Sequence, residues 1–156
     1  MHKNRTGTPV LPATSALPGT FLIQTVLKKN YLTAVGGGGR ITDVVHTNAT
    51  QPRSTEKFRL IPYPQVGGSS TPGSFAIQTA SGNYLTAVSG GGRTTDVLHT
   101  DALQVQAWEK FRLRDQGNGT YTIQTVKGNY LGAGPISTNM TDPNSAYRFR
   151  LIMYNF

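Results

Sequence analysis

Two stretches of the chain carry the same polar side chains at the same spacing. Each has an arginine, an aspartate three residues later and a histidine three residues after that, and the two sets are Arg40, Asp43, His46 and Arg93, Asp96, His99. A run of glycines, 36–39 and 90–92, precedes each arginine. Guanidinium, carboxylate and imidazole groups provide fixed hydrogen-bond donors and acceptors, and glycine lets backbone amides approach a ligand closely. This combination suits the hydroxyl groups of a carbohydrate, so both stretches are candidate ligand sites.

The single tryptophan, Trp108, adds a second kind of chemistry, because an indole face can stack on the C–H face of a pyranose. The equivalent position nearer the N-terminus is Thr55, so the fold does not demand a large ring there. Glu109 follows Trp108 directly, and Glu56 follows Thr55. Both glutamates are candidate acceptors for sugar hydroxyls. The alternatives are that Trp108 fills the core and that the glutamates pair with the lysines that follow them.

Asp96 and His99 can serve one site only under a structural condition. Residues three apart point to opposite faces of a regular strand, so a bulge or a strand end has to lie between them. The alternatives are that His99 caps a strand end or packs between units, or that the matching stretches reflect duplication without a function.

The same inventory gives little support to catalysis. The chain has 7 acidic residues, 3 histidines and no cysteine, which excludes disulfides and thiolate sites. It lacks GxSxG, HExxH and P-loop motifs, and the glycine run 36–39 is expected between strands rather than before a helix. We therefore predict a non-enzymatic protein that needs no metal and no cofactor.

The elements that position these residues come from an internal repeat. The triplet Ile-Gln-Thr begins at Ile23, Ile77 and Ile123, and each copy is followed by Tyr-Leu and by a closing Phe-x-Leu. Apolar residues alternate with a period of two, which is typical of strands, and four strands are expected in each copy. Two of them are the third strands, 41–47 and 94–100. The units are 19–62, 73–115 and 119–154, and residues 1–18, with three prolines, are expected to form a flexible N-terminal segment.

Three four-stranded units cannot each bury an apolar face alone, so they must share one core. Three units also fall below the usual number of blades in a β-propeller. An all-β fold of twelve strands in three pseudo-symmetric units, the β-trefoil, meets both conditions. The third unit lacks the Arg-Asp-His stretch, so folding does not require it, and two related ligand sites are expected in units one and two.

One copy carries a more specific resemblance. The residues Phe75-x-Ile77-Gln78-Thr79, followed by Gly82-Asn83-Tyr84-Leu85 and the closing Trp108-Glu109-Lys110-Phe111, resemble a unit of the fascin-like trefoil superfamily. The likeness covers residues 19–154. It implies a single trefoil similar to lectins and carbohydrate-binding modules, or, as the alternative, a module that binds actin or another acidic protein surface.

Charge and hydropathy limit the partners further. The net charge is +8, from 15 basic and 7 acidic residues, but the basic residues are spread over all three units rather than gathered in the stripe of a nucleic-acid binder. No apolar run approaches the length of a transmembrane helix, and residues 1–18 lack the apolar core of a secretory signal. A glycan or polysaccharide partner and a cytoplasmic location are expected, with leaderless export as the alternative.

Overall fold

The computed structural model describes residues 19–64, 72–143 and 147–154. The predicted N-terminal segment 1–18 lies outside these ranges. Within them the chain forms twelve strands and short 3-10 turns, which confirms the all-β prediction. No helix in the described ranges has the length and hydropathy needed to cross a membrane.

Six strands form a closed barrel. The pairings run from β12 through β1 and β4 to β5, and from β12 through β9 to β8. A bridge between Phe75 and Phe111 joins β5 to β8, with backbone hydrogen bonds of 2.7 and 2.8 Å in the two directions, and closes the ring. The barrel strands are β1 (Gly19–Thr25), β4 (Lys57–Pro64), β5 (Pro72–Gln78), β8 (Arg112–Gly117), β9 (Thr120–Gln124) and β12 (Phe149–Met153).

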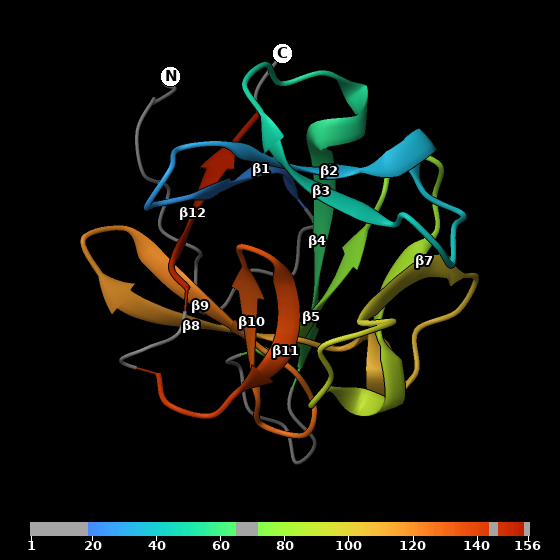
Figure 1. Cartoon of the computed structure of the whole chain (residues 1–156), viewed down its shortest axis with the longest axis vertical. Coiled ribbons are helices and arrows are strands. Elements are labelled where there is room, and N and C mark those ends of the chain that lie inside the picture. Colours follow the sequence, from blue (N-terminus) through green and yellow to red (C-terminus); the bar gives the residue numbers. More distant parts are fainter. Residues whose placement is uncertain (1–18, 65–71, 144–146, 155–156) are drawn as a thin grey trace.

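The other six strands form three antiparallel hairpins, one in each unit. Figure 1 shows the three units, coloured blue to green, green to orange and orange to red, in three sectors around a common centre. This arrangement of a six-stranded barrel and three hairpins is the β-trefoil. The hairpins pair β2 (Tyr31–Ala34) with β3 (Val45–Ala49), β6 (Tyr84–Ala87) with β7 (Leu98–Ala102), and β10 (Tyr130–Ala133) with β11 (Ile136–Met140).

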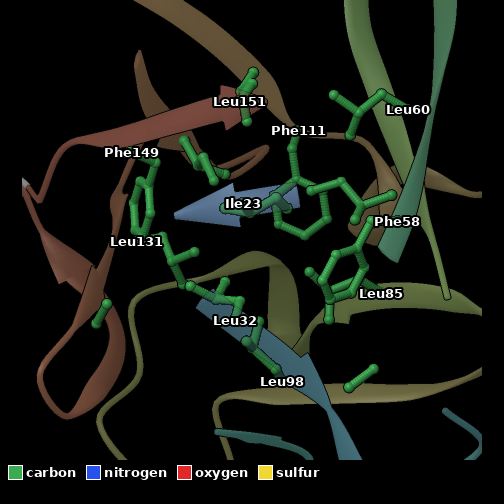
Figure 2. Packing of buried hydrophobic residues seen from close by; sticks show 14 of the residues in the cluster. Ile23, Leu32, Phe58, Leu60, Leu85, Leu98, Phe111, Leu131, Phe149 and Leu151 are labelled. Atoms are coloured by element: carbon green, nitrogen blue, oxygen red, sulfur yellow. The ribbon is translucent and has the colours of Figure 1, made fainter. Parts of the chain in front are cut away.

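The core is built from the repeated apolar positions. The three isoleucines of the Ile-Gln-Thr triplets are at most 1% exposed, and the phenylalanines of the closing motif at most 2%. Figure 2 shows that side chains from all three units pack together around Ile23. Burying one such side chain contributes about 1.5–3 kcal/mol, so a pooled core explains why each unit retains these residues.

The third strands begin later than the sequence predicts. They start at Val45 and Leu98, because Asp43 and Asp96 have φ near +48° and turn the backbone out of the extended conformation. The residues 41–44 and 94–97 are therefore loop, and the two aspartates lie before the strands that carry the histidines.

Candidate functional site

Each aspartate contacts the histidine of its own set. The Asp43 Oδ1 to His46 Nε2 distance is 2.6 Å, and the Asp96 Oδ1 to His99 Nε2 distance is 2.7 Å. The strand that carries each histidine begins only after the aspartate. The condition for the aspartate and the histidine to act at one site is therefore met. Both pairs lie at the surface, with side-chain exposures of 58% and 51% for the aspartates. Across the described residues, no three His, Asp or Glu side chains gather as a metal site would need.

The two arginines hold their own loops together. Arg40 Nε donates to the Thr42 carbonyl at 3.2 Å, and Arg93 Nε donates to the carbonyls of Thr95 and Asp96 at 3.1 and 3.2 Å. Arg93 also reaches Ser89 Oγ, at 3.5 Å. Each guanidinium is thus already hydrogen-bonded within its own loop, and only its remaining N–H groups can bind a ligand.

The glycine runs approach a neighbouring unit, not an open surface. The Gly39 amide donates to the Thr100 carbonyl at 2.6 Å, and the Thr100 amide donates to the Arg40 carbonyl at 2.9 Å. The run in unit two repeats this pattern, with Gly92 donating to Thr138 of unit three. The glycines thus let the backbones of neighbouring units approach each other closely. The sequence pattern suggested a close approach to a ligand instead.

Glu56 and Glu109 are buried, with exposures of 2% and 6%. The Glu56 carboxylate accepts hydrogen bonds from Thr33 Oγ1 at 2.6 Å, the Arg53 amide at 2.7 Å and Thr55 Oγ1 at 2.9 Å. A carboxylate that is buried and already hydrogen-bonded does not accept from an external hydroxyl. We therefore leave both glutamates out of the ligand site, and the nearby lysines are not their hydrogen-bond donors either.

Glu109 fixes the 3-10 turn Ala107–Glu109. Its carboxylate accepts from Thr86 Oγ1 at 2.6 Å and from the Gln106 amide at 2.9 Å, which ties the turn to β6. Trp108 lies on this turn. The glutamate predicted to touch a sugar is instead the residue that positions the tryptophan.

The environment of Glu56 makes stability depend on pH. Burial alone would raise the pKa of Glu56, but the hydrogen bonds from Thr33, Arg53 and Thr55 and the Arg53 charge bring that pKa below its ordinary value of 4.5. The stabilisation is therefore complete above the pKa of the unfolded chain and is lost as the pH falls through the lower folded-state pKa. We expect the difference in free energy of unfolding between wild type and Glu56→Gln to shrink between about pH 6 and about pH 3. Urea titrations across this range measure it, and a constant difference would contradict the assignment.

Trp108 is 47% exposed, so it is not a core residue. It borders a hollow of about 240 Å³ lined by Gln106, Ala107, Trp108 and Glu109. A side chain added at Gly90 would lie 3.5 Å from the indole Cδ1, 3.2 Å from Val126 Cγ1 and 3.5 Å from Lys127 Cγ. Val126 and Lys127 belong to unit three, so the group crosses a unit boundary. We call Gln106, Trp108, Val126 and Lys127 the indole platform.

Sequence comparison of the copies missed Val126 and Lys127, because they lie on a turn that the repeat marks as an ordinary connection. Their nearness to Trp108 follows from docking of the unit-two glycine loop on unit three, where the Lys127 amide donates to the Gly90 carbonyl at 3.3 Å. The one available signal was an apolar residue, Val126, in a polar turn; it is 53% exposed.

A second hollow lies between the hairpins. Its floor contains Val45, Leu98 and Ile136, which are equivalent positions facing Ala34, Ala87 and Ala133 across the three hairpins. We call it the axial hollow; its volume is about 410 Å³. The full lining is Ile41, Thr42, Asp43, Val44, Val45, Asp96, Val97, Leu98 and Ile136.

The predicted site residues thus divide into separate groups. Asp43 and Asp96, from different units, line one axial hollow, whereas Trp108 borders another hollow that contains neither aspartate. Two of the predicted polar residues are linked to the platform: Glu109 fixes the turn of Trp108, and Arg93 reaches Ser89 beside Gly90. Unit one repeats the Arg-Asp-His set with Thr55 at the tryptophan position.

Comparisons with known proteins support the architecture. No family profile and no curated protein sequence matches the chain. Among solved structures, the designed threefold-symmetric protein ThreeFoil matches with a TM-score of 0.68 at 14% identity, over 86% of this chain and 98% of its own. SeviL, solved with asialo-GM1 saccharide, matches with a TM-score of 0.62 at 13% identity, over 86% of this chain and 97% of its own.

A third match is part of a larger enzyme. The exo-β-1,3-galactanase 1,3Gal43A of Clostridium thermocellum matches with a TM-score of 0.67 at 16% identity, over 87% of this chain but 30% of the enzyme chain. At these identities the matches establish the fold. The chain is a single β-trefoil, and its closer resemblance to the fascin-like superfamily stays a prediction.

Proposed function

We propose that the protein is a non-catalytic carbohydrate-binding trefoil whose main contact is the indole platform. The observation that carries the proposal is the half-exposed Trp108, which lies on the turn that the buried Glu109 ties to β6 and borders a hollow of about 240 Å³. A tryptophan side chain has two rotatable bonds, so it loses little conformational entropy when a ligand stacks on it.

The surrounding groups suit a sugar. The exposed Gln106 amide both donates and accepts, and the Lys127 ammonium donates, so hydroxyls at the edge of a stacked pyranose find partners. Val126, which also lies beside Gly90, adds apolar surface. The remaining donors of Arg93 lie toward the same loop and can meet a second sugar residue.

Proteins of the same fold supply independent support. SeviL binds a saccharide in its solved structure, and the galactanase, whose chain includes a region of this fold, acts on a galactan. The platform has no catalytic carboxylate pair, because the neighbouring Glu109 is buried and already hydrogen-bonded, which is why the proposal is binding without turnover.

Unit one is proposed to hold a second, weaker site. It repeats Arg40, Asp43 and His46 but has Thr55 where unit two has the indole. Unit three lacks both features. Individual contacts of this kind are weak, so binding to a polymeric glycan through two sites gains from avidity.

The test begins with a glycan array, followed by calorimetry on the best ligand with wild type, Trp108→Ala, Trp108→Phe and Leu103→Ala. We expect Trp108→Ala to weaken binding by about tenfold or more, because the stacking surface is lost, and Trp108→Phe to weaken it less. Leu103 is an apolar residue with 80% exposure outside the platform, so Leu103→Ala is the matched control and should bind as wild type does.

Each outcome has a defined meaning. Equal affinity of Trp108→Ala and wild type would remove the platform from the site, and an array without any hit would overturn carbohydrate binding. Recovery of a shortened glycan after incubation would contradict the absence of catalysis. Co-sedimentation with actin filaments that the glycan does not displace would favour the protein-binding alternative.

A further inference from the structure

We propose that the axial hollow is a separate binding site for a small organic ammonium ion with an apolar body. Its floor and walls are aliphatic, with Val45, Leu98 and Ile136 at the three equivalent positions. Its volume of about 410 Å³ falls within the range of pockets that bind small molecules. The proposal concerns a different place and a different ligand class from the indole platform.

The three units contribute unequally to the lining of the hollow. Units one and two each place an aspartate and a valine over the floor, Asp43 with Val44 and Asp96 with Val97. In unit three the connection between β10 and β11 is short, and among the described residues Ile136 is its one contribution to the lining. The described lining therefore comes mainly from units one and two.

The charge of the lining selects the head group of the ligand. Among the described residues, Asp43 and Asp96 are the two charged members of the lining, and no described lysine or arginine belongs to it. Each histidine engages Oδ1 of its aspartate, which leaves Oδ2 as an acceptor. An ammonium group has three donors and no acceptor, so it complements a pair of carboxylates, whereas a carboxylate ligand would be repelled.

The two aspartates are not equivalent in this role. Asp43 Oδ2 has Arg40 Nη2 at 3.9 Å, a contact that offsets part of its charge. The Arg93 guanidinium instead binds backbone carbonyls of its own loop, including that of Asp96. Asp96 is therefore the stronger acceptor, and its loss should weaken binding more.

The experiment uses three probes of similar shape and different charge: 2-phenylethylammonium, 2-phenylethanol and phenylacetate. Amide and methyl NMR shifts of the full chain are followed during each titration. We expect saturable shifts at Val45, Leu98 and Ile136 with the ammonium ion, about tenfold weaker binding of the alcohol, and none of phenylacetate. Equal affinity for ammonium and alcohol, or no shift at these residues with the ammonium ion, would overturn the proposal.

Variants test the assignment of the carboxylates. Asp96→Asn should weaken ammonium binding more than Asp43→Asn, and the double variant by about tenfold or more. Asp101→Asn removes an exposed carboxylate of β7 outside the hollow and is the matched control. Should the double variant bind the ammonium ion as tightly as Asp101→Asn, the proposal fails.

Two further measurements separate this site from the indole platform. Trp108→Ala should bind the ammonium ion as wild type does. The melting temperature of Asp96→Asn, compared with that of wild type, shows whether the fold of this variant is intact. Loss of ammonium binding in Trp108→Ala would place the ligand at the platform and overturn the axial assignment.

Discussion

Gly38→Ala is expected to lower the free energy of unfolding by about 3–4 kcal/mol, although it adds only one methyl group. Gly38 has φ of +117°, where an L side chain is strained, and an added Cβ would overlap Thr79 Oγ1 and lie 2.9 Å from Thr79 Cβ. Thr79 is 3% exposed and cannot move aside without disturbing the core of unit two. Urea denaturation measures the loss as a lower midpoint.

Gly37→Ala is the control for backbone strain. Gly37 lies in the same loop with φ of +85°, but an added Cβ there meets nothing within 4 Å. Its expected cost is about 1–2 kcal/mol, from the left-handed backbone alone. The difference between the two variants contains the overlap with Thr79 of unit two together with the greater backbone strain at Gly38. Equal losses would mean that the loop does not need its close approach to Thr79.

Glu109→Ala is expected to lower the free energy of unfolding by about 2–4 kcal/mol, because Thr86 Oγ1 and the Gln106 amide would lose their common acceptor inside the protein. Glu109→Gln retains an acceptor and a group able to pair with the threonine, so its cost should be about 1 kcal/mol. Trp108 is the only tryptophan, so its fluorescence reports directly on the turn that Glu109 holds.

Tryptophan emission and glycan binding together distinguish an effect on the position of Trp108 from an effect on general stability. In Glu109→Ala, folded protein at low temperature should show tryptophan emission shifted to longer wavelength and weaker glycan binding. In Glu109→Gln both should stay close to wild type. Unaltered emission in folded Glu109→Ala would show that the turn keeps its shape without the carboxylate.

The sequence was sufficient to predict the fold, because the isoleucine, leucine and phenylalanine positions recur in all three copies and only a shared core explains them. It also singled out the Asp–His pairs and the exposed tryptophan, since copies that differ at one position reveal what folding does not require. The carboxylates of Glu56 and Glu109 were misjudged. Their partners, Thr33 and Thr86, lie 23 residues earlier, and nothing local marks the contact.

Contacts between units could not be predicted from local sequence patterns either. A glycine run looks the same whether it accommodates a ligand or a neighbouring strand, and only the hydrogen bonds of Thr100 and Thr138 decide between them. The division of the candidate residues between the platform and the axial hollow has the same origin, because it depends on how unit two docks on unit three.

Unit three differs from the other two units at a set of residues that lie close together. The hydrogen-bonded Thr–Glu pairs of units one and two, Thr86 with Glu109 in the second, correspond there to Gly132 and Tyr147. An added Cβ at Gly132 would lie 2.6 Å from Ser137 Oγ and 3.8 Å from Tyr147 Cδ1, and one at Gly134 would lie 2.7 Å from the Tyr147 hydroxyl. The tyrosine, the glycines and the short connection form one compatible set. Exchanging one of these residues alone for its counterpart from another unit would therefore force its neighbours to shift.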